Sequence, residues 1–431
     1  MDWQQRTLSC IATESETAVA LLRQLVEIPS EGGAPDEVRV QQYLARWCRD
    51  QGWDVDHWRL PLTDLAASPE FPGAEVDRNE AWGVVGRRRG AGGGPSLMFN
   101  GHTDVVPAGS PAQWTVTQPY VPAVRDGRLY GRGACDMKAG LVAALFAVRA
   151  LDRAEVPLAG DVLIAGVIGE EDGGLGTYGL LERGWSADAC IIPEPTGLAI
   201  VPANGGALTF RLTVFGKAAH ASHRTSGVSA VERFWPIFSA LRVLEQERNA
   251  QVDPLMRRWE LAYPIEIGTV TAGDWVSSVP DTLVAQGRFG IALGESIAEA
   301  KDRFEAAIAR ACSKDSWLAE NPVSVEWWGG QFASGRLPAQ RGMVADRLTE
   351  AHRRVTGETP QTWGAPYGSD LRLMTGIGDI PTVQYGPGDV AQAHAADEWV
   401  SLAELNRATQ ALALAAIDFC GFAEGSDDTL R

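Results

Sequence analysis

The chain lacks several features that would assign its class at once. It has no run approaching the ~18 uninterrupted apolar residues that a membrane-spanning helix needs, so no membrane span is expected. Its first residues lack a basic region followed by an apolar stretch, which predicts no secretory signal peptide. Cysteines are few and scattered, with no CxxC pair, at Cys10, Cys48, Cys135, Cys190, Cys312 and Cys420. In a chain of 431 residues this indicates reduced thiols in a cytoplasmic protein, and it argues against a disulfide framework or a zinc knuckle.

Positive charge is also scarce. Lysine and arginine total 38 residues against 55 aspartates and glutamates, which gives a net charge of −17. Because nucleic acids are bound through a basic face, this balance argues against a nucleic-acid partner. The 45% hydrophobic and 22% charged residues are ordinary for a globular protein, and the length predicts about two or three domains.

Short apolar runs alternate with helical patterns in the first half of the chain. Runs at 96–100, 162–168 and 189–192 have the length of buried strands. Segment 137–151 is almost wholly apolar and has the length of a central, buried helix. This alternation predicts an α/β fold with a mostly parallel sheet flanked by helices.

The pattern changes after Pro202. The order of predicted elements becomes strand, helix, strand, strand and helix, which predicts a small α+β domain inserted into the first domain. We therefore expect the main domain to comprise residues 1–203 and 317–431, with the inserted domain at 204–316.

A histidine and an aspartate follow the first of the apolar runs. His102 directly follows Gly101, where the predicted strand ends, and Asp104 lies two residues further on. Open α/β sheets bind ligands at the carboxyl ends of their strands, and neutral imidazole is the commonest metal-ligating side chain. A metal-bound imidazole usually donates its second ring N–H to a carboxylate. We interpret His102 as a ligand, and Asp104 as either a second ligand or the residue that orients the ring.

Further acidic and imidazole side chains follow other predicted elements. Asp136 precedes the central helix, where a simple N-cap is the alternative role, and Glu170 and Glu171 follow a strand. Glu194 follows another strand, and His394 follows a glycine-rich turn. Carboxylates and imidazoles without cysteine suit a catalytic zinc site better than a structural one. Two histidines and three carboxylates exceed the need of one tetrahedral ion and fit two ions bridged by a carboxylate.

These motifs resemble those of the dinuclear zinc amidohydrolases that include acetylornithine deacetylase, succinyl-diaminopimelate desuccinylase, aminoacylase and carboxypeptidase G. The resemblance implies a zinc exopeptidase-like catalytic domain and assigns the ligands motif by motif. His102 and Glu194 would hold one zinc ion, and Glu171 and His394 would hold the other. Asp136 would bridge both ions. Co²⁺ or Mn²⁺ in place of zinc stays open, because oxygen-rich sites accept either ion.

The same resemblance implies the chemistry. Asp104 would orient the ring of His102, and Glu170 would be the general base for a water molecule activated by the two ions. His220, in the block Gly216–Ser222, would polarise the substrate carbonyl. The implied reaction is hydrolysis of an amide in an N-acyl amino acid or related compound. An aminopeptidase or dipeptidase with the same metals is the alternative. A catalytically silent binding relative is disfavoured, because no ligand is missing.

The inserted domain implies a homodimer and a lid, again by resemblance, and it also carries departures from the family pattern. Ser277 stands where many members have an asparagine, and Gly290 stands where they have a carboxylate-binding arginine. Arg288 lies on the same strand face as position 290, and Arg372, in a block like that of the desuccinylases, is the better candidate for contacting a substrate carboxylate or carbonyl. With 15 tryptophans in the chain, we expect a small N-acyl or peptide-like substrate with a sizeable apolar group.

Overall fold

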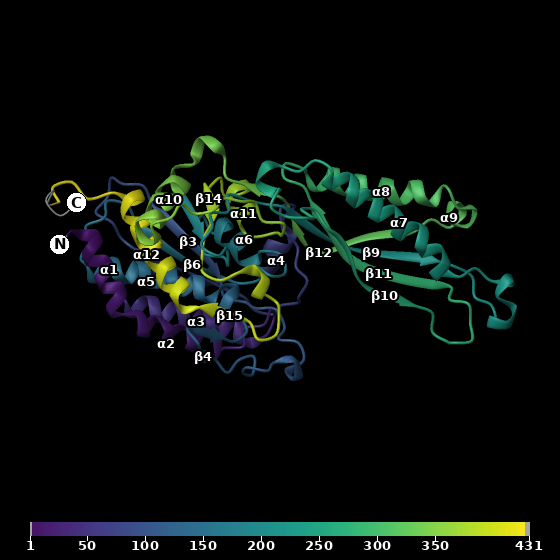
Figure 1. Ribbon diagram of the computed structural model, residues 1–431, viewed down its shortest axis with the longest axis horizontal. Helices are drawn as coiled ribbons and strands as arrows, with labels where there is room; N and C mark the ends of the chain where they lie inside the picture. Colours follow the sequence, from purple (N-terminus) through teal and green to yellow (C-terminus); the bar gives the residue numbers. More distant parts are fainter. Residues whose placement is uncertain (1, 427–431) are drawn as a thin grey trace. The chain divides into compact units, whose positions relative to one another are not determined.

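The computed structural model describes residues 2–426 and divides into two compact units, whose elements are labelled in Figure 1. Unit 1 comprises Met1–Ala203, Arg336–Trp363 and Asp370–Arg431, and unit 2 comprises Asn204–Gly335 and Gly364–Ser369. Unit 2 is thus inserted into unit 1. It continues past the expected end at residue 316, because a further strand of its sheet follows that position.

Unit 1 is built on a six-stranded sheet with the order β1-β2-β6-β3-β7-β14. Its strands are β1 (Asp54–Arg59), β2 (Trp82–Arg88), β3 (Leu97–His102), β6 (Val162–Val167), β7 (Ala189–Ile192) and β14 (Thr382–Gln384). Strands β6, β3, β7 and β14 are parallel, whereas β1 and β2 run antiparallel to their neighbours. The expected α/β fold with a mostly parallel sheet is confirmed.

Helices cover both faces of this sheet. Because side chains alternate between the faces along each strand, neighbouring residues join different cores. Leu97 and Phe99 of β3 join the core formed with α2, α3, α5, α10 and α12, whereas Met98 joins the core formed with α6 and α11. The helices of unit 1 are α1 (Trp3–Thr13), α2 (Ser15–Val26), α3 (Pro35–Asp50), α4 (Leu62–Ala67), α5 (Ala139–Arg153), α6 (Leu175–Glu182), α10 (Met343–Thr356), α11 (Leu371–Gly376) and α12 (Leu402–Cys420). Within residues 2–426, no helix has the length and apolarity needed to cross a bilayer.

Short strands complete unit 1 and its connections. A three-stranded sheet contains β4 (Ala123–Arg125), β5 (Arg128–Tyr130) and β15 (Trp399–Ser401). The two-residue strands β8 (Ala203–Asn204) and β13 (Gly335–Arg336) pair where the chain leaves and re-enters unit 1.

Unit 2 is a four-stranded antiparallel sheet with the order β10-β11-β9-β12. Its elements are β9 (Gly206–Phe215), α7 (Ala230–Asn249), β10 (Ile265–Ala272), β11 (Thr282–Ile291), α8 (Ile297–Cys312), α9 (Ser316–Glu320) and β12 (Ser324–Phe332). Helices α7 and α8 lie together on one face of the sheet (Figure 1), around a core that includes Phe210, Phe289 and Phe304. Strand β12 escaped prediction because its register shifts between Trp328 and Gln331, which breaks the alternation of side chains.

Helix α5 packs closely against the end of β7. Almost all of its side chains are buried, as its apolar sequence predicts. It begins after a turn at Ala134–Lys138, in which Asp136 and Met137 have non-helical backbone angles. A Cβ atom at Gly140 would lie 1.7 Å from the carbonyl oxygen of Pro193, so only glycine permits this approach. The contact fixes the start of α5 relative to Glu194, the residue that follows Pro193.

Replacing Gly140 with alanine should therefore destabilise the protein. The added methyl group must push α5 away from a backbone atom, and overpacking of this kind costs about 1–3 kcal/mol. Gly376→Ala is the matched control, because Gly376 is also helical and a Cβ atom there meets nothing within 4 Å. Urea unfolding should show a lower midpoint for Gly140→Ala only. Equal midpoints for the two variants would contradict this account of the packing.

Candidate active site

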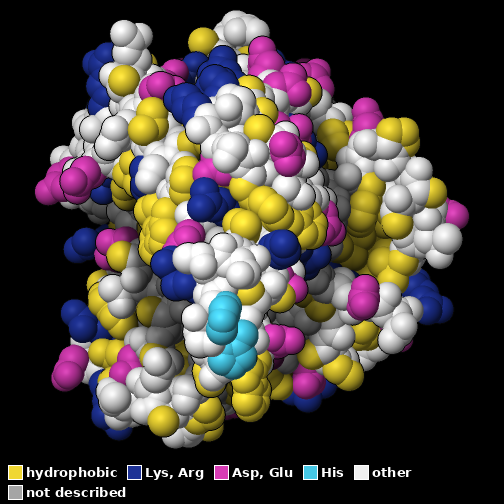
Figure 2. All heavy atoms as spheres, turned by 90° about the vertical axis from the view of Figure 1, so that its right-hand side faces the viewer, with side chains coloured by type: hydrophobic (Ala, Val, Ile, Leu, Met, Phe, Trp, Pro, Cys, Tyr) yellow, Lys and Arg dark blue, Asp and Glu magenta, His cyan; other side chains and the backbone are white. Residues whose placement is uncertain are grey.

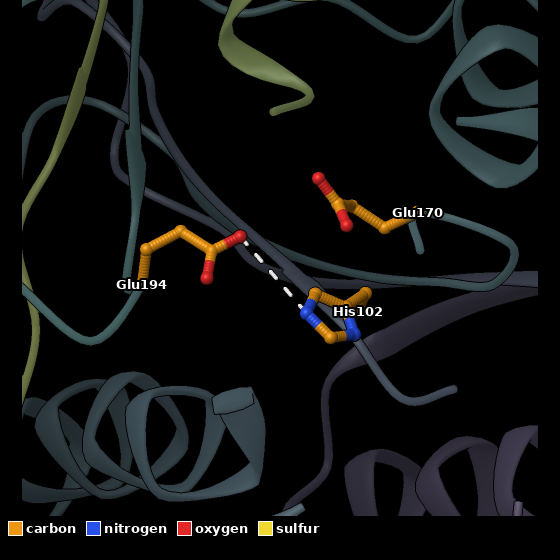
Figure 3. Close-up of side chains that lie close together, drawn as sticks. All are labelled: His102, Glu170 and Glu194. Carbon is orange, nitrogen blue, oxygen red and sulfur yellow. Dashed lines mark ion pairs between the residues drawn. The ribbon is translucent and has the colours of Figure 1, made fainter. Parts of the chain in front are cut away.

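Three neighbouring parallel strands deliver side chains to one edge of the unit 1 sheet. His102 is the last residue of β3, Glu170 follows β6 and Glu194 follows β7. Strand β3 lies between β6 and β7 in the sheet, so the three residues leave it side by side. Figure 3 shows the carboxylates of Glu170 and Glu194 approaching the His102 ring from two sides. One potential ligand atom from each of the three residues lies within 4.8 Å of the other two.

Asp136 lies between the two histidines. Its Oδ1 atom is 3.1 Å from Nε2 of His102, and its Oδ2 atom is 3.5 Å from Nε2 of His394. Oε2 of Glu171 is 3.0 Å from the same His394 nitrogen, whereas Oε1 of Glu194 is 4.0 Å from Nε2 of His102. All five residues predicted as metal ligands therefore converge within unit 1.

Asp104 supports the site through both its backbone and its side chain. The Nδ1 atom of His102 is 3.0 Å from the carbonyl oxygen of Asp104 and 3.6 Å from its carboxylate. Because a carbonyl oxygen only accepts, Nδ1 carries the proton in this hydrogen bond, which in the neutral ring leaves the Nε2 lone pair facing Asp136. The Asp104 carboxylate accepts from the backbone N–H of Glu171 at 3.2 Å. Asp104 thus holds both the ring of His102 and the backbone of Glu171.

The cluster carries more negative charge than its surroundings neutralise. Burial raises the pKa of Glu170 and of Glu194 well above the ordinary carboxyl value, and neighbouring carboxylates add to the shift. Hydrogen bonds with Asp136 and Glu171 raise the pKa of His394 to about 11. Over residues 2–426, no lysine or arginine forms an ion pair with these four carboxylates. Buried carboxylates of this kind need compensating cations, and the mixed nitrogen and oxygen donors suit zinc-like ions.

Sequence reasoning missed Glu398. Its carboxylate is buried and accepts from the backbone N–H groups of Gly133 (3.0 Å), Cys135 (2.8 Å) and Asp136 (3.0 Å). Nη1 of Arg132 donates to the same carboxylate at 2.7 Å. Glu398 therefore shapes the turn that presents Asp136. Its position four residues after His394 was the available signal, but more than 260 residues separate it from the turn that it holds.

Arg372, predicted to contact a substrate carboxylate or carbonyl, makes contacts within the protein, and its role toward substrate stays a prediction. Its side chain is buried, and Nη2 donates to the carbonyl oxygen of Gly173 at 2.6 Å. Its Nη1 atom lies 3.9 Å from Asp370, which also accepts from Thr177 at 2.6 Å. These contacts place Arg372 against the loop that carries Glu170, as a brace for its backbone.

The other three predicted site residues belong to unit 2. His220 is exposed, and its neighbour His223 is exposed as well; Figure 2 shows histidine side chains grouped on the face that it draws. The backbone N–H of Ser222 donates to Nδ1 of His220 at 3.2 Å, so Nε2 is the protonated nitrogen of the neutral ring. Ser277 lies between β10 and β11 and accepts from the backbone of Ala221 at 2.9 Å.

Position 290 has little room for a side chain larger than that of glycine. Arg288 of β11 is exposed and lies over the ring of Phe332, at 5.5 Å from its centroid. A Cβ atom at Gly290 would lie 3.0 Å from the carbonyl oxygen of Pro264. The packing against the backbone of Tyr263 and Pro264 at 3.0–3.1 Å therefore disfavours a larger side chain at position 290.

Comparison with known proteins assigns the family. Residues 98–418 match the model of peptidase family M20/M25/M40, and the chain therefore belongs to this family. The predicted family is confirmed, and the protein is an enzyme that hydrolyses an amide-type C–N bond.

Two curated relatives share a function. The chain is 26% identical over 444 residues to the N-formyl-4-amino-5-aminomethyl-2-methylpyrimidine deformylase of Halalkalibacterium halodurans, covering 96% of this chain and 97% of that protein. It is 28% identical over 412 residues to the protein of the same name from Bacillus subtilis, covering 88% and 89%.

Solved structures share the fold. A tripeptidase from Staphylococcus aureus has a TM-score of 0.71 at 22% identity, with 94% of this chain and 98% of that chain covered. Human carnosine dipeptidase 1 has a TM-score of 0.75 at 16% identity, with 97% and 99% covered.

Removing metal should destabilise the protein, and the loss should grow with pH. Because Glu170 and Glu194 have raised pKa values in the metal-free fold, they contribute stability below the unfolded-state pKa of about 4.3. That contribution is lost as pH rises through the folded-state pKa. Bound cations offset this loss, and at a free concentration about 100-fold above Kd they contribute about 2.7 kcal/mol.

The measurement is the melting temperature with zinc and with a chelator, at pH 5.5 and at pH 8. The melting temperature with zinc should exceed that with chelator by several degrees at pH 8. The difference should be smaller at pH 5.5, where protons compete for the ligands. A difference independent of pH would contradict the electrostatic description of the cluster.

Proposed function

We propose that the enzyme hydrolyses a small N-acyl compound, and specifically an N-formyl derivative of an aminomethyl-substituted heteroaromatic ring, at a pair of zinc ions. His102 and Glu194 would hold one ion, Glu171 and His394 the other, and Asp136 would bridge them. The observation that carries this assignment is that the two oxygens of Asp136 face two different histidines, at 3.1 Å and 3.5 Å. Co²⁺ and Mn²⁺ suit the same donors.

Glu170 is the general base in this proposal. When bound, the two ions would supply Lewis acidity, which polarises the amide carbonyl and lowers the pKa of a water molecule. The Glu170 carboxylate accepts the proton of the attacking water and later donates it to the leaving amine nitrogen. Its burial supports this role, because a raised pKa brings a carboxyl group closer to the pH at which it must both accept and donate.

His220 is proposed to donate a hydrogen bond to the substrate oxygen. Ser222 occupies Nδ1 of its ring through the backbone N–H, so the exposed Nε2–H is available as the donor. A donor aimed at the carbonyl oxygen stabilises the negative charge that develops as water attacks.

The N-formyl substrate class is supported by the two deformylase relatives, whose alignments extend over most of this chain. A formyl group is the smallest acyl group, so the apolar part of the substrate lies on the amine side of the amide. This agrees with the expectation of a sizeable apolar group. It also agrees with the tight packing at position 290, where backbone atoms 3.0–3.1 Å from a Cβ atom leave little room for an arginine that would bind a substrate carboxylate.

The substrate class is tested by hydrolysis assays with the zinc-loaded enzyme. The panel comprises N-formyl aminomethylpyrimidines, aromatic N-acyl amino acids, N-acetylornithine, succinyl-diaminopimelate and dipeptides. We expect the highest kcat/KM for the formylated heterocyclic amine. A preference for dipeptides with a free α-amine would favour the peptidase alternative, and a preference for N-acetylornithine or the succinyl compound would exclude the proposed substrate.

The division of roles between the two adjacent glutamates is tested by comparing Glu170→Gln with Glu171→Gln. Glu170→Gln should keep two zinc ions per chain and lose about 10²–10⁴ in kcat, because only the proton transfer is removed. Glu171→Gln should lose zinc as well, because a ligand has changed. Metal analysis together with kinetics separates the two effects. Near-normal turnover of Glu170→Gln would refute its assignment.

We also propose that the enzyme is a homodimer that pairs through unit 2. Strand β10 is an edge strand of its sheet, and Val270 on it is 52% exposed. Trp275 and Val276, in the turn that follows, are 68% and 97% exposed. An open edge with apolar side chains is a template for pairing with another strand, and a second copy of the chain would cover it.

The dimer is tested by analytical ultracentrifugation. The wild-type chain should sediment as a dimer, and Val270→Lys should shift it toward monomer, because lysine on an edge strand opposes pairing. Val121→Lys is the control, since Val121 is 59% exposed but belongs to unit 1. A monomeric wild type, or equal dissociation of both variants, would contradict the proposed interface.

A further inference from the structure

Arg78 joins two buried carboxylates behind the site. Its guanidinium donates to Glu37 from Nε and Nη2, both at 2.9 Å. It donates to Asp172 from Nη1 and Nη2, both at 2.8 Å. The side chains of Arg78, Glu37 and Asp172 are 2%, 1% and 8% exposed. We call this double fork the Arg78 clamp.

The clamp ties together three segments that are far apart in sequence. Glu37 lies in the first turn of α3, and Arg78 lies in the long connection between α4 and β2. Asp172 directly follows Glu170 and Glu171 in the loop after β6. Asp172 also accepts from the backbone N–H groups of Glu75 at 3.2 Å and Val76 at 3.0 Å.

The loop that carries the two glutamates is a tight turn that depends on its anchors. It begins at Gly169 with φ +65° and ends at Gly174 with φ +87°, and the N–H of Gly174 donates to the carbonyl oxygen of Gly169 at 2.6 Å. Arg372 holds the backbone of this turn at Gly173. The Arg78 clamp holds it through the side chain of Asp172, the residue next to Glu171.

We propose that Arg78 is a positioning residue, which sets the orientation of the Glu170 and Glu171 carboxylates through Asp172. This inference rests on the proposed roles of the two glutamates as base and ligand. Glu170, Glu171 and Asp172 are consecutive, so rotation of the turn about its glycine ends would move all three side chains together. The clamp opposes that rotation by holding both oxygens of Asp172 with two donors of one guanidinium.

Arginine is required at this position for geometric reasons. A guanidinium presents its donors in a rigid fork and grips each carboxylate with two hydrogen bonds, whereas a lysine ammonium is a single point charge that cannot reproduce both forks. Lysine nevertheless keeps the positive charge between two buried carboxylates. Arg78→Lys therefore removes the geometry of the clamp while limiting the electrostatic damage that a neutral substitution would cause.

The matched control is Arg149→Lys. Arg149 of α5 belongs to the same unit and also grips one carboxylate with two donors, Nε and Nη2 against Glu14 at 2.9 Å and 2.7 Å. It bonds Gln51 in addition, at 2.7 Å. Its partners therefore join α5 to the α1–α2 junction and to the end of α3, and none belongs to the loop that carries the glutamates.

The experiment compares Arg78→Lys with Arg149→Lys in the full chain. Three quantities are measured: kcat and KM, the Co²⁺ dissociation constant by competition with a chelator, and the visible absorption spectrum of bound Co²⁺. For Arg78→Lys we expect kcat and Co²⁺ affinity to fall by about 10–100-fold, as is typical when a partner behind a metal ligand is altered. KM should stay within about twofold, and the cobalt spectrum should change. Arg149→Lys should lower the melting temperature alone.

The proposal is overturned if Arg78→Lys matches Arg149→Lys in kcat, Co²⁺ affinity and cobalt spectrum. If Arg78→Lys does not fold, Asp172→Asn takes its place, because it retains the arginine and one acceptor oxygen and should give the same spectral change. The variant Glu171→Gln distinguishes failure of the positioning role from failure of the proposed function. Unchanged Co²⁺ binding in Glu171→Gln would refute the ligand assignment itself. Loss of Co²⁺ there, with no change in Arg78→Lys, would refute the positioning role alone.

Discussion

Negative charge concentrated at one edge of the unit 1 sheet is the constraint around which the site is organised. Parallel strands send their carboxyl ends to the same edge, so β3, β6 and β7 bring a histidine and glutamates to one place. Burying like charges together is costly unless something offsets them. The chain belongs to peptidase family M20/M25/M40 and hydrolyses an amide-type C–N bond, and we propose that these groups serve that reaction.

The chain treats its buried carboxylates in two ways. Those that face the centre of the cluster, such as Asp136 and Glu194, contact histidines and have no arginine partner among residues 2–426. Those behind the cluster are paired with buried arginines: Glu398 with Arg132, and Asp172 with Arg78. In both cases a buried guanidinium offsets negative charge behind the cluster, and Arg78 also pairs with Glu37. The carboxylates at the centre thus keep their charge available to cations. Carboxylates behind them hold the backbone that carries them, as Glu398 does at the N–H of Asp136.

The residues that face the centre of the cluster could be predicted from the sequence, whereas the carboxylates and arginines behind it (the outer residues) could not. A candidate ligand at a strand end follows from a local pattern, an apolar run that ends at a glycine and is followed by a polar residue, as at His102. The outer residues carry little local signal beyond the position of Glu398, four residues after His394. Arg78 lies in a connection without periodicity, and Glu398 acts on a turn more than 260 residues away. Arg372 matches a family motif, but its burial against Gly173 depends on packing that no motif records. The end of unit 2 was misplaced for a related reason, the irregular register of β12.

The adjacency of Glu170 and Glu171 explains why the outer residues are needed. Successive residues of an extended strand point to opposite faces, so two neighbouring side chains reach the same cluster only if the backbone leaves the strand conformation between them. The chain does this in the turn bounded by Gly169 and Gly174, whose positive φ angles favour glycine. Such a turn has few apolar side chains to fix it by packing. Its orientation must come from polar anchors. These include Asp104 on the N–H of Glu171, Arg372 on Gly173, and Arg78 on Asp172, whose carboxylate also accepts from the N–H groups of Glu75 and Val76. The Arg78 clamp acts through a side chain of the turn itself. In our proposal, the arrangement of the base Glu170 and the ligand Glu171 therefore depends on a residue outside every recognisable motif.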